Sequence, residues 1–429
     1  MSNFQIVITG IFVFFIIIGV IVFAGLKGSG TQTSPEIVLW GSVSEDLFNK
    51  FLGDVNLERP EPLKIRYVQK NQDTFHQDFV EALARGTGPD AIILPQELIL
   101  KERDKLAVIP YASFAQRDFK NTFIQEAELY LTGEGILALP FFVDPLLMYW
   151  NRDTLSSAGI ARFPKTWDEV SALSKKATIK DNASNIAQSG AALGEYRNIT
   201  HAKELLAALF MQAGNPIVGF DNGAPVSLLA KDFSYSPKPA EAVLNFYTQF
   251  SNPSKELYSW NRALPQSKNF FVAGDLALYF GFASELADIR LKNPQLNFDV
   301  APLPQSKNAA QKVTFGSMSG FAFARNSPNV AAAYSALVSL VSPAALVKWT
   351  ELTRLPPVRR DMLEIKPADP YLAVFYDSAL ISRGWLDPSG RDTNSLFQTM
   401  VENIVSGKER VGEAVTRVSQ EIDNLMPRN

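Results

Sequence analysis

The stretch LPFFVDPLLMYWNRD, residues 139–153, decides the predicted fold, because a single carboxylate interrupts a run that otherwise suits a protein core. A strand buried on both faces reads as continuous Phe, Val and Leu. A charge inside such a strand costs on the order of several kcal/mol unless it is paired or solvated. Asp144 is therefore expected either at a solvent-filled cleft or on a chain segment that crosses between two lobes.

Upstream of this stretch, predicted strands alternate with predicted helices. A helix is expected from Ser44, a plausible N-cap, and a second helix ends at Gly86. Three runs rich in buried aliphatic residues are the predicted strands, EIVLWG (36–41), LKIRYV (63–68) and DAIILP (90–95). This β-α-β-α-β order predicts a parallel sheet, with a ligand in the crevice beyond the carboxyl ends of its strands.

Downstream, the chain from about Trp167 to Gln249 is rich in predicted helix and fits a second lobe. Two polar segments within it, DNASN (181–185) and GFDNGAP (219–225), are predicted loops.

The α/β pattern returns after this helical region. NFFVAGDLALYFG (269–281) predicts a helix followed by a strand, and FDVAPLP (298–304) and SGFAFARNS (319–327) predict two further strands. From about Asp392 to Met426 the chain is predicted to form amphipathic helix, interrupted at Gly407.

Composition restricts the class of protein. The 429 residues allow two or three domains, and two are expected. A net charge of −3 means that the chain lacks the excess of basic residues typical of nucleic-acid-binding proteins. Cysteine is absent, so there are neither disulfides nor thiolate metal sites. His76 and His201 are the only imidazoles. We therefore expect no metal site and no cofactor.

The N-terminus predicts a membrane segment. Ile6 to Leu26 carry no charge over about twenty residues, the length that crosses a bilayer as a helix. Residues 1–26 are thus an anchor or a signal. MSNFQ lacks the basic residues of a cleavable signal, which favours an uncleaved anchor, although Val22 and Ala24 fit a cleavage site. The Gly/Ser/Thr-rich residues 27–35 form a flexible linker. The body is expected outside a cell membrane that the chain crosses once.

The most specific motif is MYWNRDTLSSAGI (148–160) followed by PKTWDEV (164–170), in which a strand end, a helix, a Gly turn and a P-x-T-W-D-E segment succeed one another. With this motif in place, the order of segments along the chain resembles the extracellular solute-binding proteins of ABC importers, specifically the sugar-binding family that includes maltose-binding protein. Further matching segments are IVLWGSVSEDLFNKF, GTGPDAIILPQEL, FFVAGDLALYFG, FGSMSGFAFARNSPNVAAAYSALVSLVS, LPPVRRD and VSGKERVGEAV. They cover nearly all of the chain after the linker.

The resemblance implies an α/β fold of the two-lobed, periplasmic-binding-protein-like type II class. Each lobe is a β-sheet flanked by helices, and several chain crossings form the hinge. The implied lobes are residues 36–142 with 318–354, and residues 143–317 with 355–429. The implied crossings lie at PFFVDP (140–145), near Thr314–Met318 and near Leu355–Arg359. Asp144 then stands where maltose-binding members place a carboxylate that faces the cleft.

A sugar is held by aromatic platforms against its CH faces and by polar groups at its hydroxyl edge. For this chain the resemblance implies three aromatic residues that could stack on a sugar, Trp40, Phe282 and Trp385. The candidate carboxylate acceptors are Glu97, Asp144 and Glu195. The remaining candidates are Ser42 at the end of the first strand, Met318 at the second crossing, and the neutral partners Gln96, Tyr196 and Asn394.

Each candidate also has a structural interpretation. Trp40 and Trp385 equally suit core packing, and Glu195 with Tyr196 suits a solvated helix end. The alternative for Asp144 is a salt bridge between lobes, to Arg359 or Arg360. The tryptophan of PKTWDE is expected to be a packing residue.

Catalytic motifs are incomplete in this chain. GSMSG (316–320) resembles the G-x-S-x-G nucleophile elbow, but Met318 occupies the position of the nucleophile. The chain has neither a G-x-x-x-x-G-K-[ST] phosphate loop nor an H-E-x-x-H zinc motif. Glu97 and Asp144 together leave a glycosidase open, since glycoside hydrolysis needs two carboxylates. We expect a binding protein rather than an enzyme.

Three functions remain open at this point. The first is a receptor that captures a small ligand, most plausibly a carbohydrate, and delivers it to the permease subunits of an ABC transporter. The second is a binding protein for a polyamine or another cationic solute, which acidic and aromatic cleft residues would suit. The third is the surface glycosidase. A monomer is expected in each case.

Overall fold

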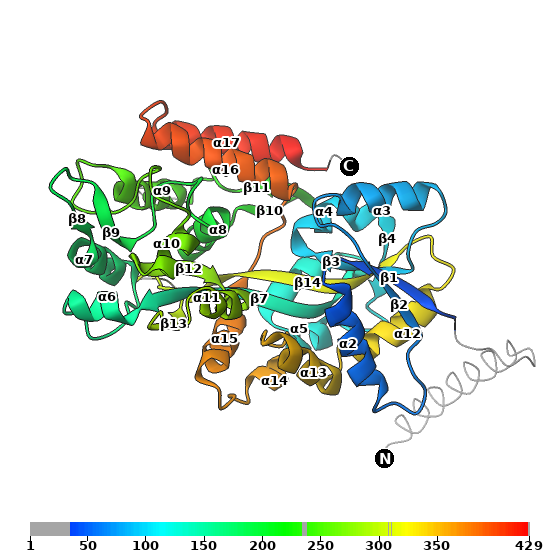
Figure 1. Cartoon of the computed structure of the whole chain (residues 1–429). Coiled ribbons are helices and arrows are strands. Elements are labelled where there is room, and N and C mark those ends of the chain that lie inside the picture. The colour runs from blue at the N-terminus through cyan, green and yellow to red at the C-terminus, as the bar shows by residue number, and fades with distance from the viewer. Residues whose placement is uncertain (1–34, 234–237, 308, 310, 428–429) are drawn as a thin grey trace, which may run out of the picture. The chain divides into compact units, whose positions relative to one another are not determined.

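Two long neighbouring strands carry the predicted first and second crossings in the computed structural model, which describes residues 35–233, 238–307, 309 and 311–427 (Figure 1). They are β7 (Ala138–Asn151) and β14 (Thr314–Ala324). The two strands pair antiparallel, with Ser317 opposite Asp144. Their register shifts between Ser319 and Gly320. Both crossings therefore run side by side and connect the strands of two lobes.

The first lobe is built on the predicted parallel sheet. β1 (Ile37–Gly41) lies between β2 (Ile65–Gln69) and β3 (Ala91–Pro95), and β14 pairs antiparallel with β3. The other short strands are β4 (Leu106–Ala107), β5 (Ile109–Pro110) and β6 (Gly135–Ile136). The helices of this part of the chain are α2 (Glu45–Asn56), α3 (Phe75–Ala84), α4 (Ile99–Glu102), α5 (Gln116–Thr122), α12 (Val330–Leu340) and α13 (Pro343–Thr353). The predicted β-α-β-α-β order is confirmed.

The ends of the predicted helices follow from their sequence only in part. α3 is followed by Gly86, which has a φ of +71°, as expected for a residue just beyond a helix C-terminus. Ser44 does occupy the N-cap of α2, but its side chain makes no capping hydrogen bond. Instead the side-chain oxygen of Gln69 accepts from the Glu45 amide at 3.0 Å. Gln69, on the neighbouring strand β2, therefore makes the capping hydrogen bond that the sequence predicts for Ser44.

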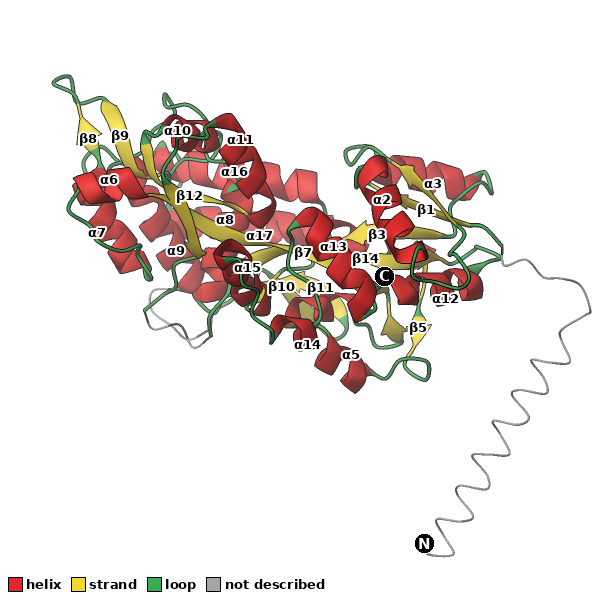
Figure 2. Cartoon of the chain, turned by 60° about the horizontal axis from the view of Figure 1, so that its bottom comes forward, coloured by secondary structure: helices red, strands yellow, loops and turns green. Residues whose placement is uncertain are grey.

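The second lobe continues the same sheet in the order β7-β12-β9-β8, and β13 pairs with β7. Its strands are β8 (Ile179–Lys180), β9 (Ile186–Ala191), β12 (Leu276–Phe282) and β13 (Phe298–Pro302), and β15 (Ser382–Arg383) pairs with β14. The remaining helices are α6 (Arg152–Ser157), α7 (Trp167–Ala177), α8 (Ala202–Gln212), α9 (Pro239–Thr248), α10 (Ser267–Ala273), α11 (Leu286–Lys292), α14 (Arg360–Leu363), α15 (Pro370–Leu380), α16 (Gly390–Val405) and α17 (Val411–Leu425). Helices cover the sheet in both lobes (Figure 2).

The helical region of the second lobe holds strands that the sequence analysis did not predict. GFDNGAP is part of a hairpin rather than a simple loop, with β10 (Val218–Asp221) antiparallel to β11 (Ala224–Ser227). The turn residues Asn222 and Gly223 both have positive φ, as the tight turn of a two-residue hairpin requires. DNASN is the turn between β8 and β9. The prediction of loops was therefore wrong for GFDNGAP.

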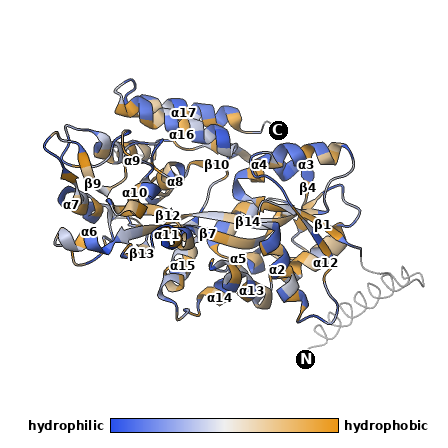
Figure 3. Cartoon of the chain, in the orientation of Figure 1, coloured by the Kyte–Doolittle hydropathy of each residue, from blue (hydrophilic) through white to orange (hydrophobic). Residues whose placement is uncertain are grey.

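The hydrophobic core extends across the crossing strands. Phe141 of β7 is fully buried, and its ring centroid lies 4.4 Å from that of Phe321 in β14 and 4.5 Å from that of Trp349 in α13. In Figure 3 hydrophilic and hydrophobic residues alternate along α16 and α17. Trp167 is 6% exposed and donates its indole N–H to Gln212 at 2.7 Å, so it is a packing residue, as predicted.

The motif at the end of β7 has a local explanation. The side-chain oxygen of Asn151 accepts hydrogen bonds from the amides of Asp153, at 3.0 Å, and Thr154, at 3.1 Å, and so caps α6. The Asn151 amide group donates to the carbonyl of Gly274, the residue that ends α10 just before β12, at 3.1 Å. One buried side chain therefore ends a strand, begins a helix and links two elements of the lobe.

We expect Asn151→Ala to lower the free energy of unfolding by about 1–2 kcal/mol, because it removes a helix cap and a buried hydrogen bond. Asn151→Asp keeps the capping oxygen but loses the donor to the Gly274 carbonyl and buries a charge, so it should not restore the stability of the wild type. Urea denaturation at pH 7 measures both changes. An unchanged midpoint for Asn151→Ala would contradict this role.

The predicted N-terminal anchor or signal, residues 1–26, and the linker up to residue 34 lie outside the described residues. The described residues from Ile37 onward form one compact unit. Among the described helices, none is by itself long and apolar enough to cross a membrane, and one pair bent by 65°, α12 with α13, passes the same test together. The exact lobe boundaries stay predictions.

Candidate ligand-binding site

Glu97 projects from the first lobe just after the carboxyl end of β3, in a 3₁₀ turn at Gln96–Leu98. Burial raises the pKa of this carboxyl above its usual value, although the nearby Lys203 ammonium opposes the rise. Its side chain accepts one long hydrogen bond, from Gln72 at 3.4 Å, and makes no ion pair with a described residue. Glu97 is thus a desolvated carboxyl that faces residues from the other lobe.

The residues opposite Glu97 belong to α8 and to the loop before α16. Lys203 contacts Asp387 and donates to the carbonyl of Gly390 at 2.9 Å. Gly390 lies so close that a Cβ there would be 3.6 Å from Cβ of Glu97. Nearby, Lys101 of the first lobe donates to the Ser389 hydroxyl at 3.1 Å. The two lobes therefore touch along this side of the site.

Asp144 lies in β7 and faces the end of β12. It is half-buried, and its carboxylate accepts a hydrogen bond from the Ser284 amide at 3.1 Å. Burial raises its pKa to about 6, against the lowering effect of the Ser284 hydrogen bonds, and the neighbouring Glu285 carboxylate raises it further while His201 lowers it. Among the described residues Asp144 has no ion-pair partner.

The alternative interpretation of Asp144 as one half of a salt bridge does not hold. Arg359 pairs with Asp361 at 2.7 Å, and Arg360 donates to the carbonyl of Phe123 at 2.7 Å. Both guanidinium groups are therefore engaged elsewhere.

A third group of side chains joins the segment before α8 to α16. The Tyr196 hydroxyl donates to Asn394 at 2.7 Å. Beside this pair is a cavity of about 540 Å³, whose lining includes Tyr196, Ile199, His201, Lys203, Glu204 and Asn394. The segment from Tyr196 to Glu204 thus lies near both carboxyl groups, because the charge of Lys203 lowers the pKa of Glu97 and that of His201 lowers the pKa of Asp144.

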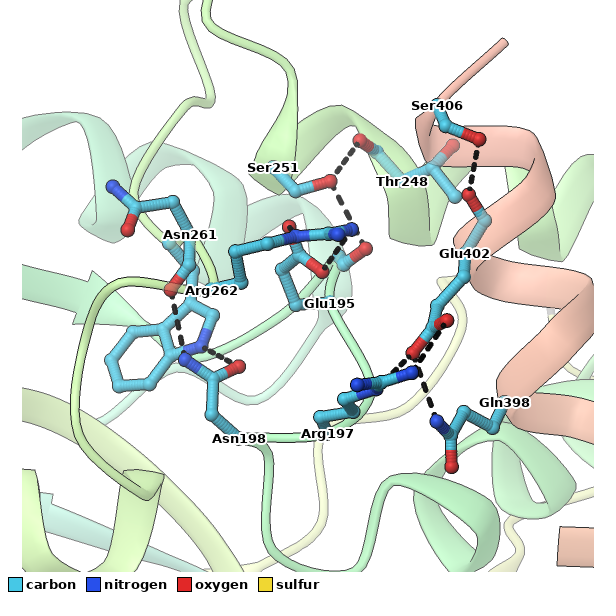
Figure 4. A network of polar contacts seen from close by, with 12 residues as sticks. Glu195, Arg197, Asn198, Thr248, Ser251, Asn261, Arg262, Gln398, Glu402 and Ser406 are labelled. Carbon is cyan, nitrogen blue, oxygen red and sulfur yellow. Dashed lines mark hydrogen bonds and ion pairs between the residues drawn. The ribbon is translucent and has the colours of Figure 1, made fainter. Parts of the chain in front are cut away.

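Glu195 is buried in a salt bridge rather than exposed at a helix end. Arg262 donates to both of its oxygens, at 3.4 and 3.3 Å, and Figure 4 shows this guanidinium lying over the carboxylate. Glu195 and Tyr196 are each 5% exposed, so the solvated alternative is wrong for both. In the same view Arg197 faces Glu402 of α16 at 2.7 Å, in an exposed pair.

The Arg262 pair has a testable effect on stability. Arg262→Ala leaves the Glu195 carboxylate buried without a cation, and we expect a loss of about 1–2 kcal/mol in the free energy of unfolding. Arg197→Ala is the matched control, because its pair is exposed and should contribute less than about 1 kcal/mol. Chemical denaturation measures the free energy of unfolding of both variants. An equal decrease in the two would contradict the prediction that Arg262→Ala is the more destabilising.

Several predicted residues have their side chains engaged in other contacts. Trp40 is 9% exposed, with Nζ of Lys70 3.8 Å from its ring centroid. Gln96 donates to the carbonyl of Gly316 at 2.7 Å and so ties β3 to β14. Met318 is fully buried in the core. Ser42 is half-buried, and its side chain makes no hydrogen bond to a described residue.

The two remaining aromatic candidates differ in exposure. Trp385 is 5% exposed and stacks on Phe397 with a centroid distance of 6.2 Å, so its ring is packed within the protein. Phe282 is half-buried, and its ring meets His201 edge-on at 4.7 Å. Its ring also meets Phe315 edge-on at 6.3 Å, and Phe282 is therefore the platform candidate that is least buried.

This arrangement of two lobes, paired crossing strands and polar groups between them agrees with the comparison to known families. A family model described as bacterial extracellular solute-binding protein matches residues 46–346. The chain belongs to this family. No curated protein sequence matches the chain. In the part of the chain that the structure describes, no cluster of His, Asp and Glu is arranged to hold a metal ion.

Solved structures of solute-binding proteins share the fold at low sequence identity. A cyclo/maltodextrin-binding protein complexed with maltotetraose is 16% identical, with a TM-score of 0.72, and the match covers 93% of this chain and 100% of that chain. A cyclic α-maltosyl-1,6-maltose binding protein from Arthrobacter globiformis is 15% identical, with a TM-score of 0.72 and coverage of 91% and 99%. UgpB from Mycobacterium tuberculosis, in complex with glycerophosphocholine, is 17% identical, with a TM-score of 0.69 and coverage of 93% and 98%. The predicted two-lobed fold is confirmed.

The sequence analysis of this solute-binding protein did not select His201, Lys203, Glu285 or Asp387. Glu285 follows the carboxyl end of β12 by three residues, so the rule that placed Glu97 after β3 would also have found it. Lys203 and Asp387 are in contact although 184 positions separate them in the sequence, and no local sequence pattern predicts that contact.

Proposed function

We propose that this protein is an extracytoplasmic receptor that captures a small carbohydrate between its two lobes and delivers it to the permease subunits of an ABC transporter. The observation that carries the proposal is the convergence of Glu97 from the first lobe and Asp144 from the crossing strand on the segment His201–Glu204 of the second lobe. Carboxylates in such a place accept hydrogen bonds from the hydroxyl groups of a sugar.

The ligands of structurally similar proteins support a carbohydrate. Structures with this fold hold maltotetraose, α-D-tagatose and mannotriose. In this chain the half-buried Phe282, which packs against His201, is the candidate ring for a pyranose, and Tyr196 with Asn394 offers neutral polar groups at the cavity.

Lobe closure provides the mechanism. A ligand that first binds one lobe gains contacts to the second lobe when the lobes meet, as they do at Lys101 and Ser389. Shifting the protein from 1% to 99% closed needs roughly 5.5 kcal/mol of differential affinity. A micromolar ligand has about 8 kcal/mol of binding free energy, which is enough. The closed form then presents both lobes to the permease.

A cationic solute is the second candidate, and one observation favours it. Three half-buried carboxylates at the site, Glu97, Asp144 and Glu204, have no ion-pair partner among the described residues. An ammonium group would compensate their charge. A protein with a similar fold, UgpB, binds a ligand with a cationic group, because its structure is a complex with glycerophosphocholine.

A binding screen separates the two candidates. The full chain, purified in detergent, is tested by thermal shift against maltotetraose, mannotriose, tagatose, spermidine and glycerophosphocholine. A carbohydrate receptor shows a saturable rise in melting temperature with a saccharide that hardly changes with salt. Stabilisation only by the cationic members, weakening as salt increases, would replace the first candidate with the second.

Three further features belong to this proposal. Residues 1–26 anchor the protein in the cell membrane, and the linker at 27–35 leaves the two lobes free to reach the permease. The lobes comprise residues 36–142 with 318–354, and 143–317 with 355–429, and the protein acts as a monomer.

A further inference from the structure

His201 has a left-handed backbone conformation in the turn that precedes α8, where the Ala202 amide donates to the Ile199 carbonyl at 3.3 Å. It has a φ of 60° and a ψ of 31°, in the left-handed region, and it occupies the N-cap of α8. N-cap residues normally have extended backbone and accept a hydrogen bond through a short side chain, whereas the His201 side chain makes no capping bond. For a residue other than glycine this conformation costs roughly 1–2 kcal/mol.

The other described residues of this kind have local reasons. Besides His201, the non-glycine residues with positive φ are Ser184, Asn222 and Arg354. Ser184 and Asn222 lie in tight turns between strands, and Arg354 ends α13. His201 also lies in a turn, and its side chain lines the 540 Å³ cavity. Non-glycine residues in this conformation cluster where the surrounding structure holds a side chain for function.

The His201 ring is held from one side only. Its Nε2 contacts a Glu285 oxygen, and the other Glu285 oxygen accepts from the Tyr279 hydroxyl at 2.6 Å and lies 3.6 Å from Nζ of Lys268. The ring also meets Phe282 edge-on. Its second ring nitrogen, Nδ1, makes no hydrogen bond to any described residue, and the side chain lines the 540 Å³ cavity with 23% of its area exposed.

We propose that His201 is a ligand contact, in which Glu285 holds Nε2–H and the strained backbone directs Nδ1–H toward an oxygen of the bound ligand. This inference rests on the proposed carbohydrate-binding function and adds a ring N–H donor to the acceptors Glu97 and Asp144. A hydroxyl or ring oxygen of the sugar is the partner that fits. His201 also discriminates among ligands, because it disfavours an ammonium group placed at Nδ1.

The charge of His201 makes this contact depend on pH. Burial lowers its pKa, but the hydrogen bond and charge of Glu285 outweigh burial and hold the pKa above its usual value. When the imidazolium loses a proton, the remaining one stays toward Glu285, and Nδ1 becomes an acceptor. Ligand affinity therefore falls as pH rises through the raised pKa. The titratable and charged groups that face His201 are Glu285, Tyr279, Lys268, Asp144, Lys203 and Glu204.

The test uses the full chain in detergent and whichever of maltotetraose, mannotriose and tagatose binds the wild type. Titration calorimetry at pH 7 should show roughly tenfold weaker binding for His201→Ala, as expected for a lost charged hydrogen bond. Ser184→Gly, the matched control at a left-handed position in a surface turn, should bind as the wild type does. The decrease in affinity at alkaline pH should be absent in His201→Gln.

A second measurement covers the chance that variants fold poorly. His76 and His201 are the only histidines, so ¹⁵N spectra of the imidazole groups resolve both in the wild type. Ligand should shift the His201 nitrogens and leave those of His76 unchanged. Unaltered His201 signals, or an unaltered affinity in His201→Ala, would overturn the inference while the proposed function stands. If none of the three saccharides binds the wild type, the proposed function fails and this inference fails with it.

Discussion

Glu126→Gln is expected to raise the free energy of unfolding at pH 9 by about 3–5 kcal/mol, the largest effect on stability that we predict. Glu126 is 1% exposed and lies against the crossing strand, where a Cβ on Gly316 would be 2.0 Å from one of its oxygens. Neither carboxyl oxygen has a hydrogen-bond partner among the described residues. Burial raises its pKa from 4.5 to about 8, and the charge of Arg383 only partly opposes this.

The sign of the effect follows from this raised pKa. The folded protein keeps the Glu126 proton up to about pH 8, whereas the unfolded chain releases it near 4.5. Stability therefore falls as pH rises between these values, and above pH 8 the fold must hold a buried negative charge. Glutamine has the same shape without a charge. Glu126→Gln should accordingly match the wild type at pH 4 and exceed it increasingly above pH 5.

Urea unfolding at pH 4, 7 and 9 measures this difference. Glu128→Gln is the control, because Glu128 lies two residues away in the same turn but forms a partly exposed pair with Lys120 at 2.8 Å. It should show little change at any of these pH values. A Glu126→Gln variant that is no more stable than the wild type at pH 9 would mean that the carboxylate has a partner in solution.

Asp144→Ala is expected to weaken ligand binding roughly 100-fold, the largest effect on affinity that we predict. The reason is that its carboxylate has no cation partner and is free to accept charged hydrogen bonds from the ligand, each worth about 1.5–3 kcal/mol. Because the Asp144 pKa is about 6, protonation should also weaken binding to the wild type as pH falls through 6. Titration calorimetry between pH 5 and 8 measures both effects.

The same substitution should not destabilise the fold, which separates a ligand contact from a structural one. The folded-state pKa of Asp144 lies above its ordinary value of 3.8, so its contribution to stability is lost as pH rises from about 4 to 6. Removing the carboxylate should therefore leave stability at pH 7 unchanged or slightly higher. Asp221→Asn, at an exposed hairpin turn, is the control for binding. Full affinity in Asp144→Ala would place the ligand elsewhere.

Local signals predicted most of the fold. The strands β1, β2, β3 and β12 are short apolar runs bounded by turn residues, and their type does not depend on distant contacts. Gly86, Gly274 and Gly407 all have the positive φ of helix-ending glycines. The β10–β11 hairpin was missed although Asn222-Gly223 is a strong local signal for a two-residue turn. That error came from the interpretation of the sequence rather than from tertiary structure.

The site was less predictable because its contacts are distant in sequence. Asp144 and Glu97 were selected by the interrupted apolar run and by their position after strands. Glu195 looked equally available, but Arg262, 67 residues away, covers it. The left-handed backbone of His201 has no sequence signal, since nothing about a histidine before a helix indicates it. Local chemistry therefore selected candidate carboxylates but not which of them are unpaired.

Amide hydrogen exchange with and without a bound saccharide tests most directly the claim that the ligand is held between the two lobes. We expect slower exchange in Gln96–Leu98 of the first lobe, around Asp144 in β7, and in Thr200–Glu204 of the second lobe, all with the same dependence on ligand concentration. Protection of one lobe alone, or of the β10–β11 hairpin, would contradict binding at this site.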